Sequence, residues 1–337
     1  MDKKAARTLA DIARLANVSK STVSRALNDS PLVNAETKAR IQALARDLEF
    51  RVNAPARNLR LRQSHTAAFV VPAYYPEFLS GEDFFGLEML GGIGRGLHGL
   101  GYDLLIAHAS PNDTAWARAY LDSGRADGFI LMASNHQPAQ LAELVGMGVP
   151  FVGWEDPVPG LDYCSVAGDN LTGGLLAGRH LLAAGRRRIA FLGGPPGSLT
   201  VQQRYQGYAR ALQAAGHSVD PRRVAYGDYT HASGAAAMRQ LLDHSPDLDA
   251  VFVNSDLMAI AAIGAVQDRG RRVPEDIAVV GYDDLSIASY SNPPLTTIRQ
   301  NLPAVGRLLA QNLVHYIQSG MVTHATTPVE LVVRRSA

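Results

Sequence analysis

Short apolar runs alternate with longer stretches of helical periodicity from residue 67 to residue 283. The first set of runs begins with AAFVV (67–71) and ends with PFVGW (150–154), and the second set begins with CSVAG (164–168) and ends with IAVVGYD (277–283). Apolar runs of about five residues without polar alternation are typical of parallel strands that are buried on both faces, and the helices between them supply the crossover connections. The repeated pattern therefore predicts two α/β lobes, each built on a doubly wound parallel sheet.

The residues before this alternation differ in composition. All 31 glycines lie at or beyond Gly81, and residues 1–65 contain 13 basic and 6 acidic side chains, a balance of +7 within a chain of net charge +1. A basic head on an acidic body is the charge distribution expected of a protein that binds nucleic acid through one end.

The head is predicted to contain three short helices. Thr8, with Asp11 three residues later, forms a capping-box pattern before the first helix. Asn17 can adopt the left-handed conformation of a tight turn, Ser19 can cap a second short helix, and Asn34 can start a third. Two helices joined by a three-residue turn and backed by a third make an all-α helix-turn-helix domain.

Head and body together resemble the LacI/GalR (lactose-repressor/galactose-repressor) family of bacterial transcription regulators. The matching segments are TLADIARLANVSKSTVSRALN (8–28), VNAETKARIQAL (33–44), NAPARNL (53–59), and in the body residues 169–196, 204–212, 254–284 and 292–301. The resemblance implies a helix-turn-helix DNA-binding domain over 1–50, a hinge over 51–64, and a two-lobed, periplasmic-binding-protein-like effector and dimerisation domain over 65–337. We expect lobe 1 to comprise about 65–165 and 296–325, and lobe 2 about 166–295 and 326–337.

The resemblance also assigns DNA contacts, because the second helix of such a head enters the major groove. Arg25 can donate two hydrogen bonds to guanine O6 and N7. The base-reading positions are Lys20, Ser21, Arg25 and Leu9. The phosphate-contacting positions are Thr8, Ser19, Thr22, Ser24 and Asn28. In the hinge, which is expected to fold only on operator DNA, the minor-groove positions are Asn53, Ala56, Arg57 and Leu59, with Leu59 as the wedge between base pairs.

Effector contacts are expected beyond the carboxyl ends of the strands, where sheets of this type bind ligands. Arg204 and Asp283 match family positions that fix hydroxyl-rich or charged effectors, and Tyr229 matches that of a stacking aromatic residue. The further candidates are Trp154, Glu155, Tyr74, Tyr75, Phe84 and Phe85. Aromatic faces with a few charged hydrogen-bonding groups suit a sugar, although a purine would use the same aromatic faces. Asp256, which follows the run AVFVN (250–254), is expected to cap the next helix.

We therefore expect a sequence-specific transcriptional regulator, by family default a repressor, that is controlled by a small molecule, a sugar in the first instance, bound between the lobes. The alternatives are a sugar-binding receptor or sugar-processing enzyme of the same α/β fold, or a purine-responsive regulator. A receptor would need an export signal, and the N-terminus has no apolar h-region. An enzyme would need an acid/base pair, but the adjacent Asp283 and Asp284 point to opposite faces of a strand.

Other features of the sequence limit the partners that we expect. The histidines lack HxxxH spacing and Cys164 is the single cysteine, so we expect no metal and no cofactor. No apolar stretch is long enough for a membrane span, and we expect a cytoplasmic protein that is not an enzyme. The expected partners are pseudo-palindromic double-stranded operator DNA, the effector and a second copy of the chain. No heptad repeat follows ELVVRRSA (330–337), so a homodimer is expected.

Overall fold

The computed structural model describes residues 8–27, 29–48, 50, 63–72, 83–109, 113–132 and 137–337. The chain divides into two compact units, residues 1–64 and residues 65–337. Within the described part, no helix is both long enough and apolar enough to cross a membrane.

The first unit contains the predicted three helices, α1 (Leu9–Leu15), α2 (Lys20–Leu27) and α3 (Ala35–Asp47). Their boundaries follow from local capping. Thr8 and Asp11 form both halves of a capping box, and Asn17 turns the chain between α1 and α2 with a φ of 51°. Ser19 Oγ accepts a hydrogen bond from the backbone N–H of Thr22 at 3.1 Å, and the Asn34 side chain caps α3. The sequence-based prediction of these helices and caps is confirmed.

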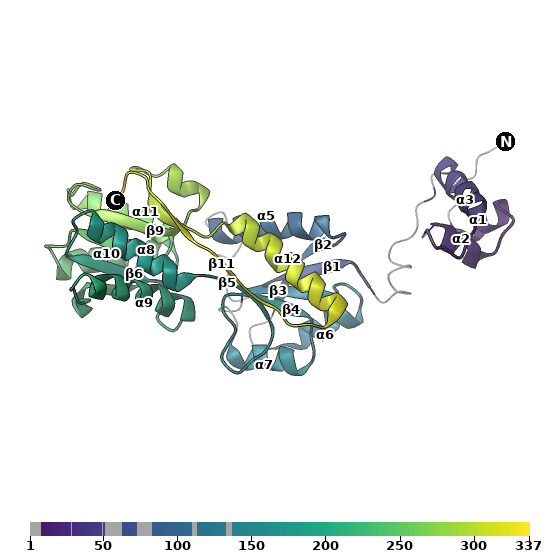
Figure 1. Cartoon of the computed structure of the whole chain (residues 1–337), viewed down its shortest axis with the longest axis horizontal. Coiled ribbons are helices and arrows are strands. Elements are labelled where there is room, and N and C mark those ends of the chain that lie inside the picture. Colours follow the sequence, from purple (N-terminus) through teal and green to yellow (C-terminus); the bar gives the residue numbers. More distant parts are fainter. Residues whose placement is uncertain are drawn as a thin grey trace. The chain divides into compact units, whose positions relative to one another are not determined.

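The second unit contains two six-stranded sheets (Figure 1). In the first sheet all strands are parallel, and their order is β11 (His324–Thr327), β5 (Cys164–Gly168), β4 (Phe151–Trp154), β3 (Gly128–Met132), β1 (Thr66–Pro72) and β2 (Asp103–Ala109). Its helices are α5 (Phe84–Gly99), α6 (Ala115–Asp122), α7 (Pro138–Gly146) and α12 (Leu302–Ser319). Helices α5 and α12 share a buried cluster with one face of the sheet, and α6 and α7 share another with the opposite face.

The second sheet has the order β12 (Glu330–Val332), β10 (Thr296–Arg299), β9 (Ala278–Asp283), β8 (Ala250–Val253), β6 (Ile189–Gly193) and β7 (Val224–Tyr226). Only the pair β10–β12 is antiparallel among these. Helices α10 (His231–His244) and α11 (Asp256–Asp268) pack on one face, and α8 (Asn170–Ala183) and α9 (Leu199–Ala214) pack on the other. Two short 3₁₀ helices, η2 (Pro221–Arg223) and η3 (Ser286–Ser289), complete this lobe. The predicted pair of doubly wound α/β lobes is confirmed.

Two strands lie in different lobes from those expected. The run CSVAG is β5 and pairs with β4 in the first sheet, so this sheet extends to residue 168 rather than to about 165. Strand β10 pairs with β9 in the second sheet, so the return to lobe 1 occurs after residue 299 rather than at 296. A continuous apolar run predicts a strand that is buried on both faces of a sheet. It does not predict which of two similar sheets that strand joins.

Glycines allow the closest helix contacts of the body. In α5, a Cβ atom added to Gly96 would lie 2.8 Å from the Cβ of Ala310 in α12, and one added to Gly92 would lie 2.7 Å from the carbonyl oxygen of Pro303. In the other lobe, a Cβ atom at Gly207 of α9 would lie 2.0 Å from the carbonyl oxygen of Leu171 in α8. These helices can approach so closely only because a side chain is missing at the contact.

Candidate DNA-binding and effector sites

Helix α2 of the head presents one polar face and one apolar face. Val23 and Ala26 are fully buried, whereas Lys20, Ser21 and Arg25 are exposed. Ser21 and Arg25 are four residues apart and therefore lie on the same side of the helix. Leu9, the fourth proposed base reader, is half-buried at the start of α1. The exposed face is available to a DNA groove, as a recognition helix requires.

The side chains that are proposed to contact phosphate differ in their exposure. Ser19 Oγ lies 2.7 Å from Ser21 Oγ and 2.8 Å from Thr22 Oγ1, so hydroxyl groups gather at the N-terminus of α2. Thr8 is exposed at the start of α1. Ser24 is only 9% exposed, because it lies on the side of α2 that packs into the head. It is therefore poorly placed for a phosphate contact.

Several predicted positions lie outside the described residues. In the head and hinge these are Asn28, Asn53, Ala56, Arg57 and Leu59, and in the body they are Tyr74 and Tyr75. Their assignments remain predictions.

In the body, Arg204 of α9 is held in a fixed, buried position. Its Nε donates to Asn170 Oδ1 at 2.9 Å and its Nη1 donates to the carbonyl oxygen of Asn254 at 2.7 Å. The guanidinium also lies over the ring of Tyr282, 3.6 Å from the centroid. At 5% exposure, the side chain is preorganised by these contacts rather than free to rotate.

Asp283 ends β9 with a φ of 111°, a conformation that turns its side chain away from the regular strand direction. Gln300 Nε2 donates to its Oδ1 at 2.6 Å, and the residue is 5% exposed. Burial raises the pKa of the Asp283 carboxyl to about 7, although the positive charge of Arg204 and the hydrogen bond from Gln300 act in the opposite direction. The site thus contains a carboxyl group that changes its charge near neutral pH.

The aromatic and acidic candidates lie near these two residues. The ring of Tyr229 covers Gly194, where an added Cβ atom would lie 2.3 Å from the ring. Burial raises the pKa of Tyr229, and the charges of Arg204, Glu155 and Asp283 also act on it, with Arg204 opposing the rise. Arg204, Tyr229, Asp283 and Glu155 therefore interact electrostatically, because the last three also raise the pKa of Arg204.

Trp154 and the phenylalanines come from the other lobe. Trp154, at the end of β4, is 4% exposed and has its ring 6.4 Å from that of Phe85, the second residue of α5. Phe84 and Phe85 are half-buried and pack against the same cluster as Trp154. An added Cβ atom at Gly168 would lie 2.5 Å from Gln300 Oε1 and 3.9 Å from Trp154, which places Gln300 and Trp154 near one another.

The sequence reasoning missed two amide side chains. Three side-chain atoms have no hydrogen-bond partner among the described residues: Asn254 Oδ1, Asn254 Nδ2 and Gln300 Oε1. Both residues are 0% exposed. An unsatisfied buried polar atom costs about 1–3 kcal/mol, so a hydrogen-bond partner for these atoms, whether water or ligand, would stabilise this part of the body. The available signal was position, because Asn254 follows β8 and Gln300 follows β10 directly. We call Arg204, Asn254, Asp283, Gln300, Tyr229, Trp154 and Glu155 the strand-end cluster.

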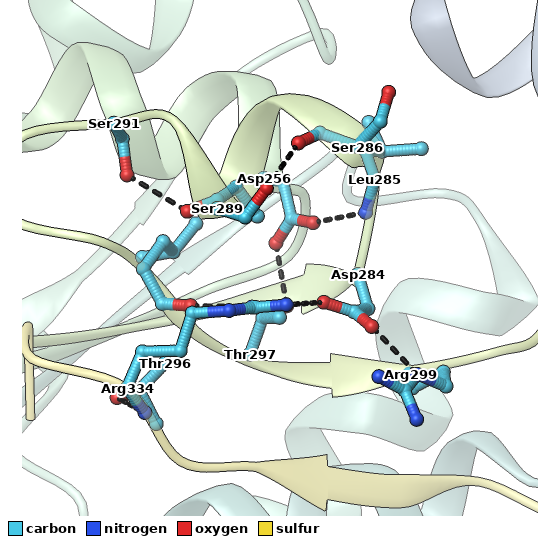
Figure 2. A network of polar contacts seen from close by, with 12 residues as sticks. Asp256, Asp284, Leu285, Ser286, Ser289, Ser291, Thr296, Thr297, Arg299 and Arg334 are labelled. Carbon is cyan, nitrogen blue, oxygen red and sulfur yellow. Dashed lines mark hydrogen bonds and ion pairs between the residues drawn. The ribbon is translucent and has the colours of Figure 1, made fainter.

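Asp256 does not cap α11 as expected. Ser255 is the N-cap and accepts from the backbone N–H of Met258, whereas Asp256 lies in the first turn of the helix. Its Oδ2 accepts a hydrogen bond from the backbone N–H of Leu285 at 2.7 Å, and its Oδ1 accepts one from Thr297 Oγ1 (Figure 2). Serine at the preceding position provides the cap with a shorter side chain, which leaves the carboxyl free to bind elsewhere.

Asp284, the residue after the end of β9, has different partners from Asp283. Arg299 Nε and Arg334 Nη2 each bind one oxygen of its carboxylate at 2.6 Å (Figure 2). The Asp284 side chain is 7% exposed. Asp284 is therefore part of a structural ion-pair network rather than of the strand-end cluster.

The lobes are also joined by two direct polar contacts. Gln203 Nε2 of α9 donates to Asp156 Oδ2 after β4 at 2.7 Å. Glu88 Oε1 of α5 accepts from both the backbone N–H and the hydroxyl of Ser286, at 2.8 and 2.7 Å. In each contact a carboxylate of lobe 1 accepts from lobe 2, so the relative arrangement of the lobes is restrained by hydrogen bonds that can break.

A helix-turn-helix head joined to a two-lobed body of this kind defines a class of regulators of transcription. Two family models match the chain: "Bacterial regulatory proteins, lacI family" over residues 8–53 and "Periplasmic binding protein-like domain" over residues 179–337. The HTH-type transcriptional regulator CelR of Thermobifida fusca is 38% identical over 336 residues, covering 98% of this chain and 97% of that protein. The ribose operon repressor of Escherichia coli is 35% identical, covering 92% of this chain and 93% of that protein. The chain belongs to the LacI family of bacterial transcription regulators.

Solved structures agree with this assignment. The complex of the transcriptional regulator CelR with cellobiose has a TM-score of 0.74 and 36% identity, covering 98% of this chain and 100% of that one. The lac repressor dimer bound to operator and the anti-inducer ONPF has a TM-score of 0.81 and 28% identity, covering 98% of each chain.

Proposed function

We propose that this chain is a cytoplasmic homodimeric repressor that binds a pseudo-palindromic operator and is controlled by a sugar bound at the strand-end cluster. The observation that carries the effector part is the set of unpaired amide atoms of Asn254 and Gln300 beside the buried Arg204 and Asp283. A sugar hydroxyl can donate and accept at once, so a ring with several hydroxyls can pair with all of these groups.

The surrounding groups favour a sugar over other ligands. Tyr229 and Trp154 offer apolar ring surface to the C–H face of a sugar, while the charged groups fix its hydroxyls. The charges of Asp283 and Glu155 both raise the pKa of Tyr229, which supports an acidic environment at this surface. Acidic groups so near Arg204 disfavour a phosphate ester, because like charges repel at short range in a buried site. The CelR relative solved with cellobiose supports the same ligand class.

The DNA part of the proposal rests on the exposed face of α2. Arg25 and Lys20 would read bases, and the hydroxyl cluster at Ser19 would hold phosphate. In a dimer, two heads would meet the two halves of the operator. Effector binding would change the contacts between the lobes at Asp156–Gln203 and Glu88–Ser286, and by linkage the effector and the operator would change each other's affinity by the same factor.

A thermal-shift screen of the full chain tests the effector class. The probes are cellobiose, ribose, glucose 6-phosphate and hypoxanthine. A ligand at 100 times its Kd stabilises the folded state by about 2.7 kcal/mol, so a specific sugar should raise the Tm clearly. Stabilisation by cellobiose or ribose is expected. Stabilisation by hypoxanthine or by the phosphate ester alone would contradict the proposal.

Operator binding is tested with double-stranded DNA selected from a random library by the full chain. We expect the selected sites to be pseudo-palindromic and to bind one dimer. The sugar that raises the Tm should change the affinity for this DNA, measured by fluorescence anisotropy at fixed salt. A selected site without two related halves would contradict the dimeric mode.

A further inference from the structure

The segment that carries Asp283 has an unusual backbone. Asp283 and the following Asp284 both have positive φ, at 111° and 57°. Aspartate reaches the left-handed region near 57° more readily than most residues, but 111° is rare for any residue with a Cβ atom, and such positions often belong to functional sites. We call residues 283–285 the β9 elbow. The direction of the Asp283 carboxyl depends on this elbow, so whatever holds the elbow also sets the geometry of the effector site.

Two sets of contacts hold the β9 elbow after Asp283. The Asp284 carboxylate is bound by Arg299 and Arg334, as described above. The next residue is held through its backbone, because the N–H of Leu285 donates to Asp256 Oδ2 at 2.7 Å. Figure 2 shows Asp256 reaching Leu285 from one side and Asp284 reaching the arginines on another.

Asp256 is placed to act as a fixed anchor. It is 0% exposed and belongs to the first turn of α11, whose start is capped by Ser255. Its second oxygen accepts the hydroxyl proton of Thr297 in β10. The strand passes over the carboxyl at Gly281, where an added Cβ atom would lie 2.4 Å from Asp256 Oδ1. One carboxyl thus contacts β9, the β9 elbow and β10.

We infer that Asp256 is a positioning residue for effector binding, whose carboxyl holds the β9 elbow on α11 so that Asp283 is presented to the sugar. This inference rests on the proposed function, because it concerns the same effector site. Asp256 itself binds the backbone and a hydroxyl, and its role is to act through Asp283.

The chemistry of the anchor agrees with this role. Burial, and then the nearby Asp283 carboxyl, raises the pKa of Asp256 well above its usual range. An asparagine has the same shape and can bond to the same two partners, with the direction of the bond to Thr297 reversed. Its Oδ1 would accept from Leu285, and its Nδ2 would donate to Thr297 Oγ1.

This equivalence provides the test. Three variants of the full chain are compared with the wild type: Asp256→Asn, Asp256→Ala and Val266→Ala. Val266 is 0% exposed in the same helix and away from the β9 elbow, so its truncation is the control for lost stability alone. The readouts are the Kd for cellobiose and for ribose by calorimetry, the Tm, and the rate of hydrogen exchange in a peptide that contains Leu285, measured without sugar.

We expect Asp256→Ala to weaken sugar binding by about tenfold or more and to speed exchange at the β9 elbow, because the Leu285 N–H loses its buried acceptor. Asp256→Asn should stay within about threefold of the wild-type Kd, since one hydrogen bond to each of the two partners remains possible. Val266→Ala should keep the wild-type Kd despite a lower Tm. Equal sugar affinity in Asp256→Ala and the wild type would overturn the inference, and so would an equal loss in Val266→Ala.

A milder variant covers the case in which Asp256→Ala does not fold. Thr297→Val is nearly isosteric and removes one of the two partners of the carboxyl. We expect faster exchange at Leu285 and weaker sugar binding, and wild-type values of both would overturn the inference. If the wild type binds neither sugar, the proposed effector class fails, while the exchange rates still decide whether Asp256 holds the β9 elbow.

Discussion

Effector affinity should depend on pH through Asp283. The carboxyl is 5% exposed, and burial raises its pKa to about 7 against the opposing effects of Arg204 and Gln300. A sugar hydroxyl donates to the ionised form, whereas the protonated form has lost an acceptor site. With this pKa, the ionised fraction of Asp283 rises from about one tenth at pH 6 to about nine tenths at pH 8. We expect only the ionised form to bind the sugar. Affinity should then increase by about tenfold, equivalent to about 1.4 kcal/mol.

Calorimetry at pH 6, 7 and 8 measures this change with the sugar that raises the Tm in the screen. Titrations in two buffers of different ionisation heat should show proton release on binding at pH 6. Asp283→Asn should leave operator binding intact and abolish the effector response, and Asp122→Asn, at an exposed position in α6, serves as the charge-matched control. A wild-type affinity that is equal at pH 6 and pH 8 would refute the reasoning.

The raised pKa of Asp283 also makes the stability of the ligand-free protein depend on pH. The folded pKa of Asp283 is raised above the unfolded value of 3.8, so the folded state binds the extra proton between that pH and about 7. The stabilisation is fully present below 3.8 and is lost as the pH rises to about 7. The free energy of unfolding should therefore fall more steeply with pH over this interval in the wild type than in Asp283→Asn, as measured by urea denaturation.

Three further outcomes are expected. Arg25→Ala should weaken specific operator binding by about 1–3 kcal/mol and relax the choice at one base pair, and an equal loss on all DNA sequences would contradict base reading. Gly207→Ala should lower the free energy of unfolding by about 1–3 kcal/mol, because its Cβ would lie 2.0 Å from a carbonyl oxygen of α8. Gly264→Ala, with nothing within 4 Å, should instead stabilise by about 0.5–1 kcal/mol, so a similar effect of both changes in urea denaturation would contradict the packing argument. Tyr208→Phe should cost about 0.5–1.5 kcal/mol through the lost 3.0 Å hydrogen bond of its hydroxyl, and unchanged stability in the same assay would disprove that contribution.

Local chemistry made the helices and the sheet class predictable. The capping box of Thr8 and Asp11, the turn at Asn17 and the caps at Ser19 and Asn34 depend on residues only a few positions apart, and all are present. The apolar runs predicted strands because burial on both faces of a sheet requires such runs. The run of β5 did not reveal which sheet it joins, and β10, with the sequence TTIR, was not predicted as a strand because it is not an apolar run.

For the proposed effector site, the sequence indicated the charged residues but not the amide side chains. Arg204 and Asp283 were predicted because they match family positions that fix effectors, and Asp283 also ends a predicted strand. Asn254 and Gln300 are ordinary in a sequence, and only the structure shows that their side-chain atoms are buried without partners among the described residues. Asp256 was assigned to a cap because a carboxylate after a strand commonly caps a helix. Its actual contacts, with Leu285 and Thr297, lie 29 and 41 positions away in the chain.

The β9 elbow also connects the proposed effector site to the segments that cross between the lobes. Gln300, which binds Asp283, and Arg299, which binds Asp284, are consecutive residues at the point where the chain leaves β10 for the first lobe. Arg299 in turn binds Glu330 at 2.7 Å, at the start of the strand by which the chain returns. An effector hydroxyl on Asp283 must either share the carboxyl with Gln300 or displace it. Displacement would act directly on a crossing segment, so a bound effector would need no longer pathway to alter the contacts between the lobes.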